Sequence, residues 1–248
     1  MDFTFGIITC GENDTFIEEI IESIIKNNIP NYEIIIVGNT NIKETDSIKI
    51  IYFDENIKSG WITRKKNIIV LNATYENIVL LHDYIKLGDN WYQGFLEFGD
   101  NYDFCITKII NKDGQRFRDY TLFPEEIGFL NVFYTPGKDI DRYFDDNCLL
   151  PYNFENNIKT NKYLYISGSY YVIKKSIAIH HLLDENLVHW RGEDLEYSKR
   201  LHSKGIIIKC NSYSEVILLK QKKSEPWEKE INLFYLNKFI KYCENNEE

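Results

Sequence analysis

Apolar runs alternate with helix-like repeats along the first hundred residues. Nearly continuous apolar runs are typical of parallel strands that are buried on both faces of a sheet. These runs cover residues 3–9, 32–39 and 77–84, with a shorter one at 47–53. Between them, residues 14–27 and 61–74 carry apolar side chains at helical spacing. The alternation predicts an α/β fold, with helices flanking an open and mostly parallel sheet.

The pattern becomes less regular in the second half of the chain. After a predicted helix at 90–99 and a strand at 102–111, residues 123–162 are rich in Pro, Asn, Asp and aromatic side chains without a clear period. A segment of this length is either a functional loop or locally ordered. Residues 163–176 read as two strand segments that are interrupted at Ser167–Ser169. A helix at 193–204, strands at 206–211 and 214–220 and an amphipathic helix within 226–243 follow.

We therefore expect a single domain over residues 1–248. Residues 1–111 form its first half, residues 112–224 a smaller mixed portion, and residues 225–248 a C-terminal helix. That helix is expected to pack on the domain, with contact to a membrane surface or to a second subunit as the alternatives.

Composition and charge exclude several classes of protein. The net charge of -9 argues against broad nucleic-acid binding, which needs a basic surface. The five cysteines are scattered without a C-x-x-C pair, which is typical of free thiols rather than of disulfides or a zinc site. The N-terminus lacks the basic and apolar regions of a signal peptide, and no apolar run reaches about 18 residues. These features predict a cytoplasmic protein.

Polar residues follow three of the predicted strands, at 9–13, 38–41 and 82–84. In open α/β sheets, ligands bind beyond the carboxyl ends of the strands. Each cluster alone is typical of a solvated loop, whereas together they indicate the floor of a nucleotide pocket. No glycine-rich phosphate loop is present, which argues against dinucleotide oxidoreductases and P-loop NTPases.

Without such a loop, a bound diphosphate needs another source of positive charge. A divalent cation on Asp83 and the basic residues Arg64–Lys66 are the candidates. The alternatives are that Asp83 forms a turn and that the basic triplet lies on a solvated helix face.

The order of five segments resembles a family 2-type glycosyltransferase of the GT-A fold, over roughly residues 3 to 210. The segments are YEIIIVGN, GWITRKKN, NIVLLHDY, ISGSYYVIKKS and GEDLEYSKRLHSKG. Lys66–Asn67 stands at the family's Arg-Asn position, 16 residues before His82, where its metal motif begins. Glu193–Asp194 matches the acid pair that carries the family's catalytic base.

The resemblance implies an inverting transfer of a sugar from a nucleoside-diphosphate sugar, with UDP-sugar as the default, to a hydroxyl of a glycan or other acceptor. Asp194 is then the general base and Glu193 orients it or caps the helix, while Asp83 holds Mn²⁺ or Mg²⁺. The implied donor-binding residues are Thr9, Glu12, Asn39, Arg64, Lys66, His82 and Asp83. The implied acceptor-binding residues are Gly168, Ser169, Trp190 and Gly192.

The sequence departs from the family at two of these positions. His82-Asp83-Tyr84 replaces the Asp-x-Asp metal motif, and Asn39 stands where the family usually has an acid. The acids at 193 and 194 are also compatible with simple helix capping. A catalytically silent relative that binds a glycan or a protein is therefore one alternative. A nucleotidyltransferase is the other, although the loop after the first strand lacks the basic residues that it would need.

Aromatic residues in 120–165 are candidates for an acceptor wall, or for a small core under a long loop. They are Tyr120, Phe123, Phe133, Tyr134, Tyr143, Phe144 and Tyr152.

Overall fold

The computed structural model describes residues 1–122, 149–189, 191–223 and 229–245. Eight strands of this part of the chain form one sheet, in the order β3-β2-β1-β4-β9-β6-β10-β5, and two short strands pair separately as β7-β8. The strands of the large sheet are β1 (Phe3–Ile8), β2 (Tyr32–Val37), β3 (Ile48–Ile51), β4 (Asn77–His82), β5 (Ile85–Leu87), β6 (Phe104–Ile110), β9 (Tyr170–Lys174) and β10 (Ile208–Leu218). The short pair consists of β7 (Thr121–Leu122) and β8 (Leu164–Tyr165).

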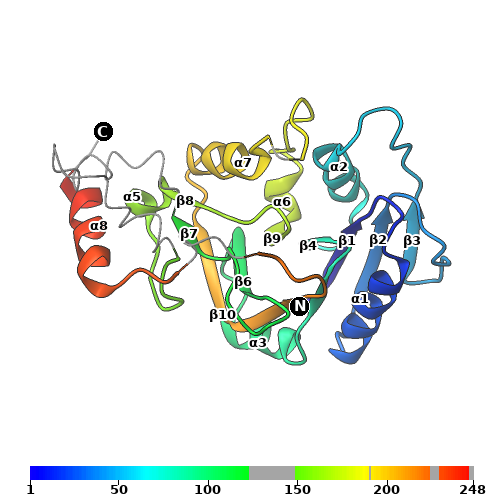
Figure 1. Ribbon diagram of the computed structural model, residues 1–248, viewed down its shortest axis with the longest axis horizontal. Coiled ribbons are helices and arrows are strands. Elements are labelled where there is room, and N and C mark those ends of the chain that lie inside the picture. The colour runs from blue at the N-terminus through cyan, green and yellow to red at the C-terminus, as the bar shows by residue number, and fades with distance from the viewer. Residues whose placement is uncertain (123–148, 190, 224–228, 246–248) are drawn as a thin grey trace.

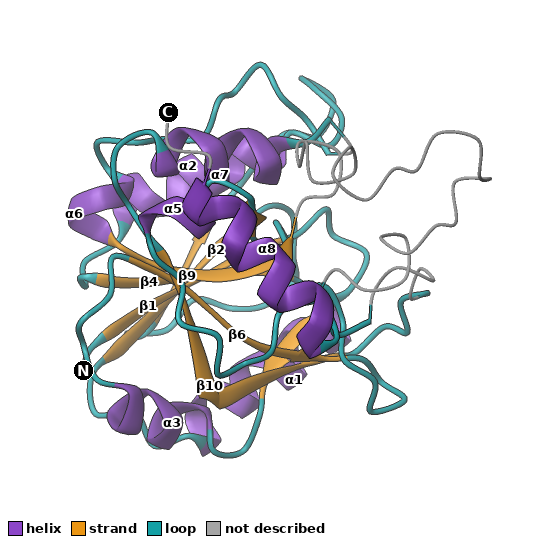
Figure 2. Cartoon of the chain, turned by 90° about the vertical axis from the view of Figure 1, so that its left-hand side faces the viewer, coloured by secondary structure: helices purple, strands orange, loops and turns teal. Residues whose placement is uncertain are grey.

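Helices cover both faces of the sheet. They are α1 (Asp14–Lys26), α2 (Ile62–Asn72), α3 (Trp91–Phe98), α5 (Ile158–Asn161), α6 (Lys175–Ala178), α7 (Glu193–His202) and α8 (Leu233–Asn245). Two perpendicular views place α2, α6 and α7 on one side of the sheet and α1 and α3 on the other (Figures 1 and 2). The predicted α/β architecture with a largely parallel sheet is confirmed.

The strands β1, β2, β3 and β4 run parallel, as their continuous apolar sequences predicted. All residues of β1 and β4 are buried, since both of their faces are covered. The chain moves outward from β1 to β3 and then returns to place β4 on the other side of β1. The carboxyl ends of β1 and β4 therefore meet at a topological switch point, the usual place of a ligand crevice in such sheets.

Beyond β4 the sheet is mixed. β9 runs antiparallel to both of its neighbours, β4 and β6, and joins the two halves of the chain in one sheet. The apolar runs at 206–211 and 214–220, predicted as separate strands, form the single strand β10 with a register shift between Asn211 and Glu215. The predicted division of the domain at residue 111 stays a prediction.

An aromatic cluster fixes α3 against the sheet. Trp91 packs on Phe3 and Phe95, with ring centroids 5.0 and 4.4 Å apart. Its indole N–H donates to the hydroxyl of Tyr170 at 2.9 Å, so the only polar atom of this buried side chain is satisfied.

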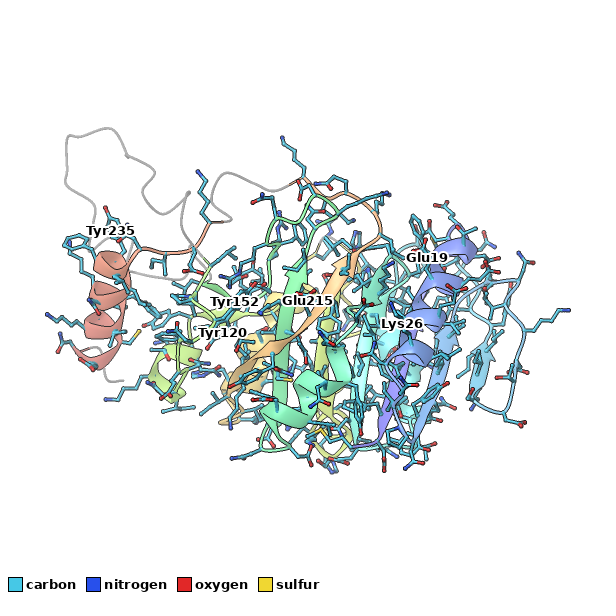
Figure 3. All side chains as sticks on the ribbon, turned by 90° about the horizontal axis from the view of Figure 1, so that it is seen from below. Glu19, Lys26, Tyr120, Tyr152, Glu215 and Tyr235 are labelled. Atoms are coloured by element: carbon cyan, nitrogen blue, oxygen red, sulfur yellow. The ribbon has the colours of Figure 1, made fainter. Side chains whose placement is uncertain are left out.

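A buried carboxylate organises the second half of the chain. Asp119 is fully buried and accepts hydrogen bonds from Arg116 and from the hydroxyl of Tyr152, both at 2.7 Å. The Arg116 guanidinium stacks on the Tyr152 ring at 3.9 Å. Tyr120 also contacts this carboxylate, since its backbone N–H donates to Asp119 at 2.6 Å, and Tyr235 lies on α8 at the far end of the molecule (Figure 3).

The C-terminal helix α8 packs on this second half. Phe239 is fully buried and contacts the rings of Phe154 and Tyr163. This packing agrees with the expectation of a helix docked on the domain. In the described part of the chain, no helix has both the length and the apolar character needed to cross a membrane.

Candidate functional site

The first part of the site lies where β1 and β4 end. The backbone N–H of Asp83 donates to the carbonyl of Ile8, which continues the strand pairing one residue beyond β4. Oδ2 of Asp83 accepts hydrogen bonds from the Thr9 hydroxyl at 2.7 Å and from the Asn13 amide at 3.1 Å. The Thr9 hydroxyl in turn accepts from the backbone N–H of Gly11 at 3.0 Å. Asp83 therefore ties the loop after β1 to the end of β4.

Asn39 lies beside this loop, directly after β2. A Cβ atom on Gly11 would approach the Asn39 Cβ to 3.2 Å, so the two segments are in contact. The amide oxygen of Asn39 is buried and has no hydrogen-bond partner among the described residues. A buried acceptor without a partner is costly, and a ligand that donates a hydrogen bond there would relieve this cost. Glu12, predicted to contact the donor, is exposed on the same loop.

Two lysines of α2 point into the protein, contrary to the solvated helix face that a basic triplet usually indicates. Lys65 is 3% exposed and donates to the Thr9 carbonyl at 2.8 Å, and it also pairs with Glu55. Lys66 is 1% exposed and donates to the carbonyl of Gly168. Burial lowers the pKa of Lys66 to about 8, although Glu193 and Asp194 oppose this effect by favouring its charged form.

Arg64 faces away from these lysines. Its guanidinium forms a partly exposed ion pair with Glu185 at 2.9 Å. Asn67 binds the chain near Glu185 as well, since its side chain donates to the carbonyl of Leu183 and accepts from the N–H of Leu183. In the structure, Arg64 thus helps to hold residues 183–189 against α2. Its predicted contact with the donor stays a prediction.

The predicted acid pair begins α7. Gly192 occupies the N-cap position with a φ of 71°, a left-handed conformation that favours glycine. Glu193 is 7% exposed, and burial, reinforced by the charge of Asp194, raises its pKa. The two carboxylate oxygens of Asp194 accept from the backbone N–H groups of Leu195 at 2.9 Å and Gly168 at 3.2 Å. Backbone donors therefore fix the orientation of the Asp194 carboxylate.

Gly168 connects α2 to this acid pair. Its carbonyl accepts from Lys66, and its N–H donates to Asp194. A Cβ atom at this position would lie 2.9 Å from a carboxylate oxygen of Glu193, so a larger residue would displace the acid pair. The neighbouring carbonyl of Ser169 accepts from the backbone N–H of His82 at 3.0 Å, which places the predicted acceptor loop against the end of β4.

The acid pair lines a cavity of about 510 Å³, and most of the predicted acceptor-binding residues line the same cavity. Its walls are formed by the end of β4, the loop before β9, the start of α7 and the segment after β10. The lining residues are His82, Tyr84, Phe117, Arg118, Tyr165, Ser167, Gly168, Ser169, His189, Gly192, Glu193, Asp194, Leu195, Lys222 and Lys223.

His82 lies at the inner end of this cavity. Its ring is 6.3 Å from that of His189, measured between centroids, and its Nε2 atom is buried without a hydrogen-bond partner in the described part of the chain. Burial lowers the pKa of His82 well below its ordinary value, and the nearby Lys66, His189 and Lys222 lower it further. The imidazole is therefore neutral, in surroundings of positive charge.

Several residues of the cavity were not predicted from the sequence. They are His189, Tyr84, Arg118 and Lys222, for which the sequence alone indicated no part in binding. Lys222 reaches the cavity because the chain beyond β10 runs beside Tyr84, whose carbonyl accepts from the N–H of Leu219 at 2.8 Å. A basic run after the last strand, KQKK at 220–223, was the available signal.

Some predicted residues lie outside the described part of the chain. They are Trp190, Phe123, Phe133, Tyr134, Tyr143 and Phe144. Of the remaining candidates for an acceptor wall, Tyr120 is 1% exposed and Tyr152 is bonded to Asp119, and neither lines the cavity. Tyr120 belongs to the core, and Tyr152 is half-buried beside Arg116 and Asp119.

A second cavity, of about 600 Å³, shares no residue with the first. It is lined by charged side chains of α1, β5 and β10, including Glu19, Lys26 and Glu215 (Figure 3). Lys26 pairs there with Asp89 and Lys86 with Glu19, in ion pairs that are open to solvent. Such pairs contribute little energy, and we assign no chemistry to this cavity.

Comparison with known proteins identifies the fold. No protein-family model matches the sequence, and a search of curated proteins gives no match. Among solved structures, the chain is similar to GalNAc-T7 crystallised with UDP, GalNAc and Mn²⁺, with a TM-score of 0.59 at 13% identity over 91% of this chain and 46% of that one. It is also similar to S. aureus TarS 1–349 in complex with UDP-GlcNAc, with a TM-score of 0.55 at 11% identity over 98% of this chain and 65% of that one.

A third structure, S. aureus TarS 1–349 in complex with UDP, gives a TM-score of 0.53 at 12% identity over 88% of this chain and 61% of that one. The chain thus spans between 46% and 65% of the length of these structures. GalNAc-T7 and TarS are GT-A glycosyltransferases. The likeness shows that the chain has the GT-A glycosyltransferase fold that its sequence predicted.

Proposed function

We propose that this protein is an inverting glycosyltransferase, which moves a sugar from a UDP-sugar to a hydroxyl of a glycan or another acceptor. The observation that carries the proposal is the acid pair Glu193–Asp194, which lines a cavity at the end of β4, beside the topological switch point of a GT-A fold. A helix cap without catalytic function would not need an oriented carboxylate in such a cavity.

The donor nucleotide is assigned to the loops after β1 and β2. The buried oxygen of Asn39 needs a hydrogen-bond donor, and the imide N–H of uracil supplies one. Binding of UDP by two of the similar structures and of UDP-GlcNAc by a third supports this choice of base. The diphosphate would then extend past Thr9 and Asp83 toward the cavity.

In the proposed reaction, the acceptor hydroxyl attacks the anomeric carbon of the sugar while its proton passes to the Asp194 carboxylate. The bond between the acceptor oxygen and the anomeric carbon forms as the bond from that carbon to the diphosphate breaks. The electron pair of the broken bond stays on the departing UDP. Asp194 later releases the proton to water, so the acid pair is regenerated.

Glu193 and Gly168 are assigned supporting parts. Gly168 orients Asp194 through its N–H and leaves room for the Glu193 side chain. The raised pKa of Glu193 makes its carboxyl group a weaker acid than usual, which suits a group that holds the acceptor by a hydrogen bond.

A divalent cation at Asp83 is the remaining part of the predicted site, and the residues present do not fit one. Oδ2 of Asp83 is already bonded to Thr9 and Asn13, and the flanking positions are His82 and Tyr84. Among the described residues, no group of three His, Cys, Asp or Glu side chains is arranged to hold a metal ion. Mn²⁺ is present with GalNAc-T7, whereas the reaction proposed for this protein uses its own side chains.

A thermal-shift comparison of nucleoside diphosphates tests the proposed donor class. A ligand at 100 times its dissociation constant stabilises the folded state by about 2.7 kcal/mol, enough for a clear rise in Tm. We expect UDP and UDP-sugars to raise Tm more than ADP or GDP do, and Asn39→Ala to reduce the UDP effect. Asn72→Ala, at the exposed end of α2, is the matched control. Absence of a shift with every nucleotide would favour the catalytically silent relative.

A further inference from the structure

Lys222 holds a fixed position above the residue that replaces the last acid of the metal motif. Its ammonium group lies 4.2 Å from the centroid of the Tyr84 ring. Its backbone is anchored by Asn111, which accepts from the Lys222 N–H at 3.0 Å and donates to its carbonyl at 2.5 Å. Two backbone contacts and one ring contact thus hold the positive charge at the edge of the cavity.

Other cations surround the same space. Arg118 and Lys223 line the cavity with Lys222, and the buried Lys66 lies beneath its floor, bonded to Gly168. On the opposite side, Asp83 is directed toward Thr9 and Asn13. Three cations thus line the cavity with His82 and Tyr84, and the carboxylates of the cavity, Glu193 and Asp194, lie at the start of α7. A divalent metal ion needs anionic oxygen ligands around it, which His82 and Tyr84 do not supply.

Such an arrangement suits a doubly charged anion. A lysine ammonium is a compact charge with three N–H donors, which bonds phosphate oxygens directly. A UDP-sugar whose base lies at Asn39 and whose anomeric carbon lies near Asp194 must bring its diphosphate past the end of β4, where these cations are concentrated.

We propose that Lys222, supported by the field of Lys66, takes the place of a divalent cation in stabilising the diphosphate of the donor and of the departing UDP. The inference rests on the proposed function. As the bond from the anomeric carbon to the diphosphate breaks, the electron pair remains on the terminal phosphate oxygen, and the Lys222 ammonium donates a hydrogen bond to that phosphate. No proton leaves Lys222, because the proton of the acceptor hydroxyl goes to Asp194.

The test compares the binding of UDP and UMP by calorimetry, with the full chain in EDTA, in Mg²⁺ and in Mn²⁺. UMP carries the same base and ribose but lacks the terminal phosphate. In EDTA, we expect UDP to bind about tenfold more tightly than UMP, since a charge-assisted hydrogen bond contributes on that scale. Added metal should change the UDP affinity by less than about twofold.

Variants at position 222 separate the lysine from a metal. Lys222→Met should remove the preference for UDP over UMP, and Lys222→Arg should restore most of it. Lys49→Met, on the exposed strand β3, is the matched control and should leave both affinities unchanged. Circular dichroism confirms that each variant is folded.

The outcomes distinguish this inference from the proposed function. Tight binding of UDP only with Mn²⁺ or Mg²⁺ would overturn the inference and leave the proposed function standing. Equal preference for UDP in the wild type and in Lys222→Met would overturn it as well. Failure of both UMP and UDP to bind under every condition would contradict the proposed function itself.

Discussion

At the scale of single residues, the site places a buried cation next to two carboxylates. Lys66 would be costly inside the protein without the nearby charges of Glu193 and Asp194, and even with them its pKa falls from 10.5 to about 8. The buried lysine has a positioning function that accounts for this cost. Lys66 donates to the carbonyl of Gly168, and the N–H of Gly168 orients Asp194.

The lowered pKa of Lys66 predicts how stability depends on pH. Between pH 8 and 10.5, Lys66 is protonated to a larger extent in the unfolded chain than in the folded chain. The free energy of unfolding therefore increases as the pH rises through this range. The full gain is roughly 3 kcal/mol, at 1.36 kcal/mol per pKa unit. Urea unfolding should show the wild type gaining stability relative to Lys66→Met across this range, with Lys49→Met as control. Parallel pH curves for wild type and Lys66→Met would contradict the account.

Gly168→Ala should reduce activity strongly and destabilise the protein by about 1–3 kcal/mol, as overpacking of a buried position does. The added Cβ would lie 2.9 Å from Glu193 and 3.2 Å from the Asp194 Cβ, so the start of α7 must move. We expect UDP release to fall about 100-fold or more, because small displacements of a catalytic group are costly. Gly99→Ala provides the contrast, since its φ of 82° strains an alanine at the end of α3 and Gly99 does not line the cavity. That variant should lose stability but keep its activity per folded molecule.

The sequence predicted a helix that begins at Glu193–Asp194, and α7 begins there, since a glycine before two acids at a helix start is a local pattern. The catalytic role of the pair stays a prediction. The sequence did not predict the burial of Lys65 and Lys66. Lys65 is covered at Thr9 and Glu55 and Lys66 at Gly168, and no local pattern within α2 reports these contacts. Lys222 was missed for the same reason, because its neighbour Tyr84 is distant in sequence.

At the scale of elements, α2 and the segment 183–189 form one positioning unit for α7. The Trp61 indole and the Lys58 ammonium donate to the carbonyl of Glu185, and the Thr63 hydroxyl donates to the carbonyl of Leu187. The N–H of His189 donates to the carbonyl of Gly60. The backbone of the segment before the acid pair is therefore held by hydrogen bonds to the start of α2 and to the loop before it.

Two neighbouring variants of α2 should separate positioning from donor binding. Asn67→Ala removes two bonds to the buried backbone of Leu183 and should destabilise the protein by about 1–3 kcal/mol. Arg64→Ala removes a partly exposed ion pair and should cost less than about 1 kcal/mol. If Arg64 also contacts the donor, as the sequence predicts, Arg64→Ala should raise KM for the UDP-sugar, measured as UDP release. An unchanged KM would limit Arg64 to its pair with Glu185.

Element prediction succeeded where a strand is buried along its whole length and failed where a strand contains a register shift. The apolar runs of β1, β2 and β4 left little choice, since both faces of these strands are covered. β10 was divided in two because Asn211, Ser212 and Ser214 interrupt its apolar pattern at the register shift. The register shift accommodates these polar residues, and the Ser214 hydroxyl donates to the carbonyl of Trp91 at the start of α3.

At the scale of the whole molecule, strand order brings the proposed site together. β9 enters the sheet beside β4 in the opposite direction, so the loop before it, at Gly168–Ser169, meets the end of β4. The donor loops from the first half and the acid pair from the second thereby lie at one edge of the sheet. The order of segments predicted this fold, but the sequence alone could not place the acids against His82, because that depends on the antiparallel insertion of β9.

The release of UDP from a panel of UDP-sugars, compared between the wild type and Asp194→Asn, tests the central claim most directly. The change keeps the shape of the side chain and removes its ability to accept the proton of the acceptor hydroxyl. We predict UDP release by the wild type with at least one UDP-sugar, a fall of about 100-fold or more in Asp194→Asn, and unchanged UDP affinity. Equal rates for the two proteins, or no release by the wild type from any UDP-sugar with any acceptor tested, would contradict the account.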